Sequence, residues 1–278
     1  MCVLRVDFRM LRLVTFNPYR SLGIPGVVYI KPEHLFRERD RLAEADWVLF
    51  PEYWQLNPLV YGIGARIYPS QSSYLMGHNK VEMTRVLMSV APEHVPQTEI
   101  LPSTPSALEQ VLDAFSFPFV AKTIKSSMGQ GVFLIESRGQ LRDYAAVHDI
   151  LYVQEYLPAT RDLRVVMVGD SVLTAYWRVS DSGAFHHNVA MGGRIDFADV
   201  PDMPLQLVER VSRKLGIDHA GYDLIEFGGH WYFLELNVLF GNQAINDAGI
   251  PLAAHIHRYL VSRHNTPPRN VPELPLAM

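Results

Sequence analysis

Two glycine turns between apolar segments constrain the fold of this chain more strongly than any other feature. Gly169-Asp170 and Gly228-Gly229 are dipeptides of the kind that close tight β-hairpins. The apolar segments that they join are residues 163–168, 171–179, 222–227 and 231–236. The turns therefore predict two antiparallel hairpins, which together with the helices expected between them make an α+β pattern.

The later two-thirds of the chain continues this pattern. Further strands are expected in three apolar runs, at residues 119–124, 132–136 and 151–155. Apolar residues recur at helical spacing in four segments, residues 77–90, 106–115, 204–215 and 248–261. Ser106 is expected to N-cap the second helix, with Glu109 completing a capping box, and Gly216 to end the third. Residues 92–105 hold four prolines, so a connector or an edge strand is expected there.

The first part of the chain alternates short apolar runs with turns and a helical segment. Strands are expected at residues 11–16, 26–30 and 47–50, and a helix at residues 32–45. Alternation of strand, helix and strand is typical of a parallel sheet. We therefore expect a small α/β unit ahead of the hairpins.

Composition narrows the classes of function. Hydrophobic residues make up 48% of the chain, which is ample for a folded core. The net charge of -4 is not the basic excess of a nucleic-acid-binding protein. No apolar run approaches the roughly 18 residues of a membrane span. Cys2 is the single cysteine, and charges interrupt the apolar N-terminus, unlike a signal peptide. A cytoplasmic protein is expected.

The segment from Lys122 to Val132 places a lysine in a strand, followed by a loop rich in glycine and serine and then by another strand. Glycines let backbone N–H groups close on phosphate oxygens, and the lysine adds positive charge. The Walker A sequence is absent, and the strand after the loop is unlike a Rossmann fingerprint. Taken alone, an ordinary hairpin loop is an equally good interpretation.

Three oxygen-bearing side chains fall on the second hairpin. Glu235 and Asn237 are two residues apart and face one side of the sheet, and Asp223 lies in the partner strand. Carboxylate and amide oxygens are ligands that Mg²⁺ accepts, with phosphate oxygens and waters completing its octahedron. The alternative is a solvated sheet face, because exposed strand faces are normally polar.

Two more segments suit a nucleotide. Residues 154–157 (Gln-Glu-Tyr-Leu) end a strand just before Pro158 and could present backbone groups to an adenine edge. Taken alone, a plain strand end is the simpler interpretation of this segment. Arg164 and Arg178 are placed on partner strands, and arginine holds phosphates by paired hydrogen bonds. A surface role is the alternative for each arginine.

In their order along the chain and their amino-acid sequences, these segments resemble the ATP-grasp superfamily. Within it they resemble the branch of the ribosomal protein S6 glutamate ligase and related amino-acid ligases. The resemblance covers about residues 79–260. The motifs that carry it are Asn79-Lys80, Phe119-Val-Ala-Lys122, Gly129-Gln-Gly131-Val132, residues 154–157, Asp162-Leu-Arg164, Gly169-Asp170, Asn188 with Gly192-Gly193, Gly221-Tyr-Asp223-Leu224, and Glu235-Leu-Asn237 with Gly241. Each motif is ordinary, whereas the ordered set is specific.

The resemblance implies an ATP-grasp fold, in which two α+β subdomains grip ATP behind a small N-terminal α/β domain. It implies that Lys80 and Lys122 contact the phosphates of ATP. Arg164 and Arg178 would hold the γ-phosphate or an acyl phosphate, with Asn188 near the reacting phosphoryl group. The loop closing over the triphosphate would consist of Gly129, Gln130, Gly131 and Val132.

The remaining roles follow from the same resemblance. The adenine would be bordered by Gln154, Glu155, Tyr156 and Leu157, through Glu155 at its amino group or the Leu157 backbone at the ring, and Asp162 would lie at the ribose. Two Mg²⁺ ions, with Mn²⁺ as an alternative, would bind Asp223, Glu235 and Asn237. We expect domains at residues 1–75, 76–157 and 158–265, followed by a proline-rich tail at residues 266–278.

The implied reaction is ATP-dependent carboxylate–amine ligation through an acyl phosphate. Its substrates would be a small carboxylate and an amine such as an amino acid or a peptide, or else a peptide or protein acceptor, with neither nucleic acid nor membrane involved. The alternatives are an ATP-grasp kinase, a carboxylate–thiol ligase and a non-catalytic nucleotide-binding protein. A homo-oligomer is left open.

Departures from the family pattern gather on the acceptor side. The family often has basic residues near Asn188, where this chain has His186, Ala190 and Met191. It often has Ser-x-Pro-Gly after the metal-binding asparagine, where this chain has Val238-Leu-Phe240-Gly241. His186 and His187 would either contact substrate or form an unremarkable loop pair. The nucleotide half of the pattern is intact.

Overall fold

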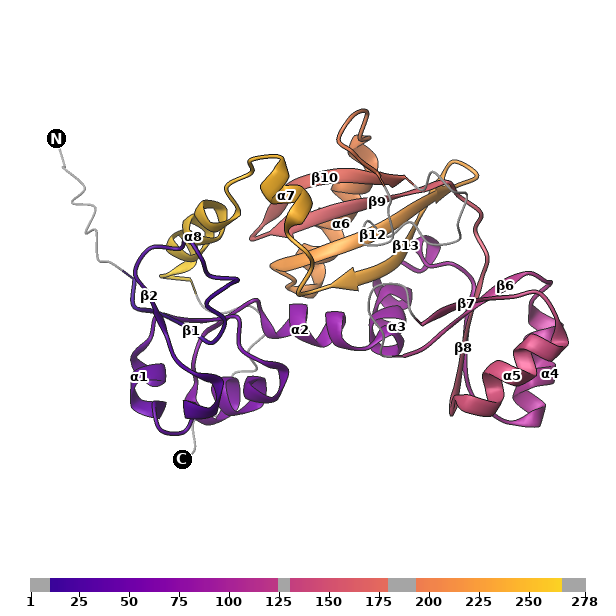
Figure 1. The fold of residues 1–278 in the computed structure, drawn as a ribbon, viewed down its shortest axis with the longest axis horizontal. Coiled ribbons are helices and arrows are strands. Elements are labelled where there is room, and N and C mark those ends of the chain that lie inside the picture. Colours follow the sequence, from indigo (N-terminus) through magenta and orange to yellow (C-terminus); the bar gives the residue numbers. More distant parts are fainter. Residues whose placement is uncertain (1–10, 125–130, 180–193, 267–278) are drawn as a thin grey trace.

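Three sheets in a row form the molecule (Figure 1). The computed structural model describes residues 11–124, 131–179 and 194–266. The strand orders are β2-β1-β3-β4 in the N-terminal sheet, β5-β8-β6-β7 in the outer sheet, and β11-β10-β9-β12-β13 in the central sheet. One parallel sheet followed by two antiparallel ones confirms the predicted α+β class with a small N-terminal α/β unit.

The N-terminal sheet is parallel, as predicted. Its strands are β1 (Leu13–Thr15), β2 (Val27–Tyr29), β3 (Trp47–Leu49) and β4 (Ile67–Tyr68). The single helix predicted at residues 32–45 is wrong. A 3-10 turn at Pro32–His34 precedes α1 (Arg39–Glu44), because Glu38 leaves helical geometry with φ −97° and ψ 19°.

The central sheet is built on the two predicted hairpins. Its strands are β9 (Arg161–Val168), β10 (Ser171–Val179), β11 (Arg194–Asp196), β12 (His219–Phe227) and β13 (His230–Asn237). Gly169, Gly228 and Gly229 have φ of 73°, 60° and 77°, which L side chains rarely adopt. The two turns thus need glycine, and for this reason they could be predicted from the sequence.

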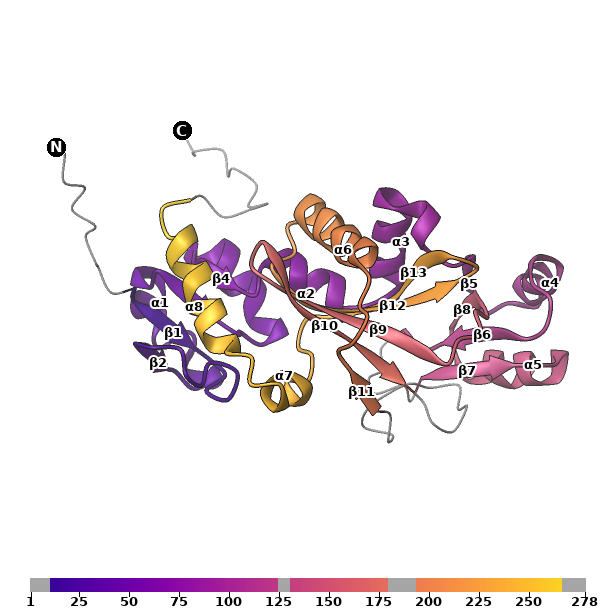
Figure 2. The same ribbon diagram turned by 90° about the horizontal axis from the view of Figure 1, so that it is seen from above.

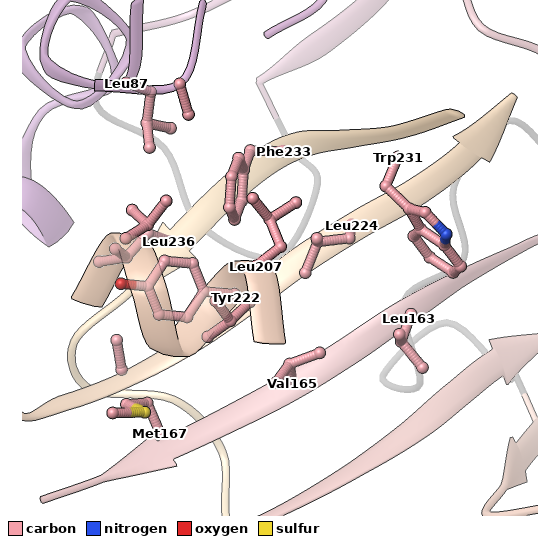
Figure 3. Packing of buried hydrophobic residues seen from close by; sticks show 14 of the residues in the cluster. Leu87, Leu163, Val165, Met167, Leu207, Tyr222, Leu224, Trp231, Phe233 and Leu236 are labelled. Carbon is pink, nitrogen blue, oxygen red and sulfur yellow. The ribbon is translucent and has the colours of Figure 1, made fainter. Parts of the chain in front are cut away.

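The strand β9 is buried on both faces. Leu163, Val165 and Met167 face helix α6 (Asp202–Leu215), as Figure 3 shows for the core that they share with β12 and β13. Val166 and Val168 face the other way, into a cluster with the N-terminal sheet and helix α8 (Leu252–Arg263). Figure 2 shows α8 lying along that sheet. The two apolar clusters fix the central sheet against its neighbours on both sides.

The outer sheet comprises β5 (Thr98–Pro102), β6 (Phe119–Lys122), β7 (Val132–Ile135) and β8 (Ile150–Glu155). The strand β5 lies at its edge, as its prolines predicted. Helix α4 (Pro105–Ala114) is capped by Thr104, whose Oγ1 accepts from Ala107 N at 3.2 Å. The predicted Ser106 cap is wrong, because Pro105 lacks an N–H and suits the first helical position. Helix α5 (Arg138–Val147), capped by Ser137, was not predicted.

Two predicted helices have different bounds in the structure. The helix expected at residues 77–90 is α2 (Gln71–His78) followed by α3 (Lys80–Val90). Asn79 breaks it with φ −140° and caps α3, since its Oδ1 accepts from Val81 N at 2.9 Å. The helix expected at residues 248–261 is α8, which begins only at Leu252 because Gly249 has φ 67° and Pro251 precedes the first turn, and the short helix α7 (Gln243–Asp247) before it was not predicted.

The break at Asn79 makes Lys80 the first residue of α3 and thereby aims this helix terminus at the end of β6, where Lys80 N donates to Ile124 O at 3.3 Å. Among the helices described, none is long and apolar enough to cross a bilayer. The domain boundaries set out above stay predictions.

Candidate active site

Two arginine–carboxylate pairs lie side by side on β9, β10 and β12. Arg164 is directly opposite Asp223, and Arg178 is directly opposite Asp162, so each pair shares one face of the sheet. Arg164 Nε and Nη2 donate to the two oxygens of Asp223 at 2.5 and 3.1 Å. Arg178 donates to both oxygens of Asp162 at 2.6 and 2.9 Å, and its Nη2 lies 3.1 Å from Asp223 Oδ2. Asp223 is thus held by two guanidinium groups.

Burial sets the electrostatics of this cluster. Asp223 is 6% exposed, and burial alone would raise the pKa of its carboxyl, but Arg164 and Arg178 hold that pKa below its usual value. Burial raises the pKa of Asp162 to about 6, although Arg178 opposes the change. Buried ion pairs contribute little net stability, because desolvation offsets attraction. The cluster is therefore more readily explained by a role in ligand binding or catalysis than by a contribution to the stability of the fold.

Gly221 provides the room for one of the arginines. A Cβ on this residue would lie 2.8 Å from Arg164 Nη1 and 3.0 Å from Phe240 Cβ, closer than real Cβ contacts. Any larger residue at this position in β12 would displace the guanidinium or the ring of Phe240. The glycine is therefore part of the machinery that positions Arg164.

The two predicted phosphate-binding lysines face the same region from other elements. Lys80 Nζ, at the start of α3, is 2.9 Å from Glu235 Oε1 on β13. Lys122 Nζ, at the end of β6, donates to Gln154 Oε1 on β8 at 2.6 Å. Burial lowers the pKa of Lys122 to about 8, with Lys80 acting in the same direction and Glu235 opposing it. Lys80 on α3 and Lys122 on the outer sheet thus lie close enough for their charges to interact.

The predicted metal ligands share one face of the β12–β13 hairpin. Asp223 is directly opposite Glu235, and Asn237 is opposite Gly221, two positions along. Among the described residues no group of three or more His, Cys, Asp or Glu could hold a metal, so the third donor here is an amide. Two carboxylates and an amide oxygen fit the hard-oxygen preference of Mg²⁺. The assignment itself stays a prediction.

The other predicted nucleotide residues are only partly placed. Glu155 Oε1 accepts from Gln97 N at 2.7 Å, and Leu157 is buried at the end of the strand. Gly131 lies in a turn just before β7, and Val132 is the first residue of that strand. Gly129, Gln130, Asn188, His186 and His187 lie outside the described residues. Asp162, predicted at the ribose, has both of its oxygens engaged by Arg178. The roles in nucleotide binding remain predictions.

A cavity of about 280 Å³ adjoins this cluster and was not predicted. Its walls are residues 16–17, 50–53, 77–78 and 237–239, together with Tyr74. Asn237 belongs both to this cavity and to the predicted metal triplet, so the two sites are contiguous. The sequence offered one signal for this cavity. Residues 51–53 follow a predicted parallel strand, and ligands of open α/β sheets bind at the carboxyl ends of such strands.

Comparison with known proteins identifies the family of this chain. Residues 77–260 match the RimK-like ATP-grasp domain family. A ribosomal protein bS6–L-glutamate ligase of Escherichia fergusonii is 28% identical over 157 residues, which are 54% of this chain and 52% of that protein. The chain thus spans about half the length of the curated relative it matches.

Solved structures share the fold. A RimK domain ATP-grasp protein from Sphaerobacter thermophilus superposes with a TM-score of 0.66 at 17% identity, covering 89% of this chain and 98% of that one. The ATP-grasp ligase PsnB, complexed with precursor peptide PsnA2 and AMPPNP, gives a TM-score of 0.66 at 15% identity, covering 91% and 97%. The fold is therefore the ATP-grasp fold, and the match over residues 77–260 shows that the chain belongs to the RimK-like ATP-grasp family.

Proposed function

We propose that this protein is an ATP-dependent carboxylate–amine ligase that forms an amide bond and releases ADP and phosphate. The observation that carries the proposal is the meeting of four basic side chains with three carboxylates at the junction of the outer and central sheets. The basic residues are Lys80, Lys122, Arg164 and Arg178, and the carboxylates are Asp162, Asp223 and Glu235. The excess of positive charge suits a triphosphate, and the oxygen donors suit its metal.

The chemistry begins with activation of a carboxylate. A carboxylate oxygen attacks the γ-phosphorus of ATP, the bond from that phosphorus to the β–γ bridging oxygen breaks, and ADP leaves. Positive charge placed beside the transferring group stabilises the charge that spreads over its oxygens. Arg164 and Arg178 are proposed for this task, since buried partners hold both guanidinium groups in fixed orientations.

Amide formation follows from the acyl phosphate. The amine nitrogen attacks the carbonyl carbon, the bond from carbon to the phosphate oxygen breaks, and phosphate leaves with the electron pair. The nitrogen gives up one proton to phosphate or water. Exclusion of water protects the acyl phosphate until the amine arrives, and we propose that the segment of residues 129–132 closes over it.

Magnesium is the proposed metal cofactor. Asp223, Glu235 and Asn237 would hold it, and bound Mg²⁺ would neutralise phosphate charge and orient the γ-phosphoryl group. In this proposal Asp162 positions Arg178 through its two hydrogen bonds, in place of contacting the ribose. Lys80 and Lys122 would contact the phosphates, and residues 154–157 would border the adenine.

An ATP-grasp kinase or thiol ligase would use the same nucleotide groups, so the intermediate and products discriminate between them. Hydroxylamine intercepts an acyl phosphate and gives a hydroxamate. We expect hydroxamate to form when the enzyme, Mg-ATP and a pool of carboxylic acids are mixed with hydroxylamine. A phosphorylated alcohol without hydroxamate would instead identify a kinase. ATP binding without any ADP would support a nucleotide-binding protein.

A further inference from the structure

The cavity of residues 16–17, 50–53, 77–78 and 237–239 lies where an open α/β sheet binds ligands. The N-terminal sheet has the order β2-β1-β3-β4, so the strands that follow β1 in the chain lie on opposite sides of it and the strand order switches direction between β1 and β3. Ligands of such sheets bind beyond the carboxyl ends of the strands at that switch point. Phe16 and Asn17 follow β1, and Phe50 follows β3, so this wall of the cavity is the switch point.

Backbone strain marks the same place. Phe50 has φ 47°, which is rare for a bulky residue, and its N–H donates to Tyr68 O at 2.6 Å. Strained residues of this kind cluster at functional sites, where surrounding structure maintains them. The strained position turns the chain at the end of β3 and leads it into the cavity wall at residues 51–53.

The opposite wall belongs to α2 and to the segment after β13. Gly77 is required there, since a Cβ on it would lie 2.8 Å from Val238 N. The rings of Tyr53 and His78 stack at 3.7 Å between centroids and join the two walls. The cavity therefore has walls from the N-terminal sheet and from the end of the metal-binding hairpin, and Asn237 connects it to the reaction centre.

The lining combines aromatic and aliphatic side chains with Asn17, His78 and Asn237, and it has one carboxylate, at its rim. Glu52 carries that carboxylate, and its Oε2 accepts from Trp54 Nε1 at 2.5 Å, which leaves further lone pairs available. Among the described residues no lysine or arginine lines the cavity. Arg20, the nearby cation, donates instead to Leu239 O and Phe240 O at 3.0 and 3.1 Å. An anionic group placed in this cavity would therefore meet no lysine or arginine of the described lining and would be repelled by Glu52.

We propose that this cavity binds the amine substrate, and that this substrate is a small primary amine with an aromatic or branched apolar body and no anionic side group. The ammonium group would be attracted to Glu52 on binding and would give up one proton to solvent before the neutral nitrogen attacks. The body would lie against Phe50, Tyr74 and Leu239. The volume of about 280 Å³ is at the small end for ligand pockets, which suits an amine the size of one amino acid.

This assignment rests on the proposed ligase function, because Asn237 joins the cavity to the proposed site of the acyl phosphate. It separates the chain from glutamate ligases, whose name implies an acidic amino acid. In that case the altered residues after Asn237 follow from the substrate, since Val238 and Leu239 form an apolar wall where a charged substrate would need polar partners.

Binding can be measured apart from catalysis. The probes are 2-phenylethylamine, its near-isosteric acid 3-phenylpropionate, and L-glutamate, titrated calorimetrically into the full chain, with Trp54 fluorescence as a second readout. We expect the amine to bind at least tenfold more tightly than either acid. The Glu52→Gln variant keeps the shape of the side chain. It should weaken binding of the amine about tenfold, in line with the loss of one charge-assisted hydrogen bond.

Two further variants complete the test. Glu44→Gln removes an exposed carboxylate from α1 and should leave amine binding unchanged. Leu239→Lys adds a cation to the exposed part of the wall and should shift preference toward 3-phenylpropionate. Equal binding of glutamate and the amine, or amine binding that is indifferent to Glu52→Gln, would overturn the proposal.

The same titrations separate this assignment from the ligase proposal. If the amine binds as expected but neither ADP nor hydroxamate forms with any carboxylic acid, the ligase proposal fails while the pocket assignment stands. If an amide product forms but its amine is acidic or insensitive to Glu52→Gln, the pocket assignment fails while the ligase proposal stands.

Discussion

The ion cluster on β9, β10 and β12 differs in kind from the cavity beside the N-terminal sheet. In the cluster, directly opposite residues such as Arg164 and Asp223 are buried partners, so strand register fixes their geometry. The cavity is walled by segments after strand ends and by α2, and its lining combines aromatic rings and two asparagines with one carboxylate. The cluster suits a ligand common to a whole family, whereas the cavity suits a substrate particular to this chain. In the proposed account, reaction type and substrate choice thus depend on different parts of the molecule.

The largest effect is expected at Glu235. Glu235→Ala removes a proposed metal ligand and the partner of Lys80, so ADP release with pooled carboxylic acids and amines should fall by about a thousandfold, equivalent to several kcal/mol. Circular dichroism should show an intact fold. Glu226→Ala, on the same hairpin but exposed, is the matched control. Wild-type ADP release by Glu235→Ala would contradict the metal assignment.

Lys122 should control nucleotide affinity in a pH-dependent manner. The Lys122→Met variant should raise the Kd for Mg-ADP roughly tenfold to a hundredfold, since a charge-assisted bond is lost. Because the pKa of Lys122 is about 8, wild-type affinity should decrease as pH rises through that value, and the variant should lack this step. Calorimetric titrations from pH 7 to 9 check both expectations.

The same lysine affects stability in the opposite direction. Its pKa in the fold lies below the usual value of 10.5, so the unfolded chain binds more protons between about pH 8 and 10.5. Lys122 therefore makes the fold more stable as pH rises across that window, relative to Lys122→Met. Lys214→Met, at an exposed position of α6, is the control. An unchanged nucleotide affinity in Lys122→Met would contradict the phosphate role.

Asp162 tests whether the cluster works as a unit. Asp162→Asn keeps the volume but weakens the hold on Arg178, so the rate of phosphoryl transfer should decrease roughly tenfold, as for other groups that orient reacting side chains. Mg-ADP affinity should hardly change. Because the pKa of Asp162 is about 6, the wild-type rate should fall as pH drops through 6, and the variant should lose that dependence.

A matched control for Asp162 is Asp170→Asn, which alters the exposed pair with Arg263. If Asp162 instead contacts the ribose, the Asn variant should weaken Mg-ADP binding and leave the rate of the bound complex unchanged. Single-turnover measurements with titrated nucleotide separate these two outcomes.

The smallest effect is expected at the cavity wall. Gly77→Ala places a methyl group against Val238 N, and α2 must shift, at a cost of about 1–3 kcal/mol and several degrees in melting temperature. The apparent KM for the amine should increase while Mg-ADP affinity stays constant. Gly62→Ala, where a Cβ meets nothing within 4 Å, is the control. A larger loss of nucleotide affinity than of amine affinity would contradict the division between the two regions.

The parts of the fold that local chemistry specifies could be predicted from the sequence. The glycines at residues 169, 228 and 229 adopt conformations that other residues avoid, so both hairpins were readable. The parallel N-terminal unit could be predicted from the alternation of expected strands with a helical segment. The shared face of Glu235 and Asn237 followed from their spacing, whereas Asp223 joins that face only because the strand register shifts between Asp223 and Leu224.

What could not be predicted depends on contacts between distant segments. The break at Asn79 is invisible in the helical spacing around it, yet it decides where Lys80 points. The bidentate grip of Arg178 on Asp162 requires the register of β9 against β10. The cavity combines residues 16–17 with residues 237–239, more than 200 positions apart, and no local pattern joins them.

The most direct test of the ligase account is ADP release from Mg-ATP in the presence of pooled carboxylic acids and amines, with mass spectrometry of the products. The account predicts ADP formation that requires one acid and one amine together, and a new product whose mass is their sum less one water. ADP formed with a phosphorylated alcohol, or with an acid and a thiol in place of the amine, would contradict it.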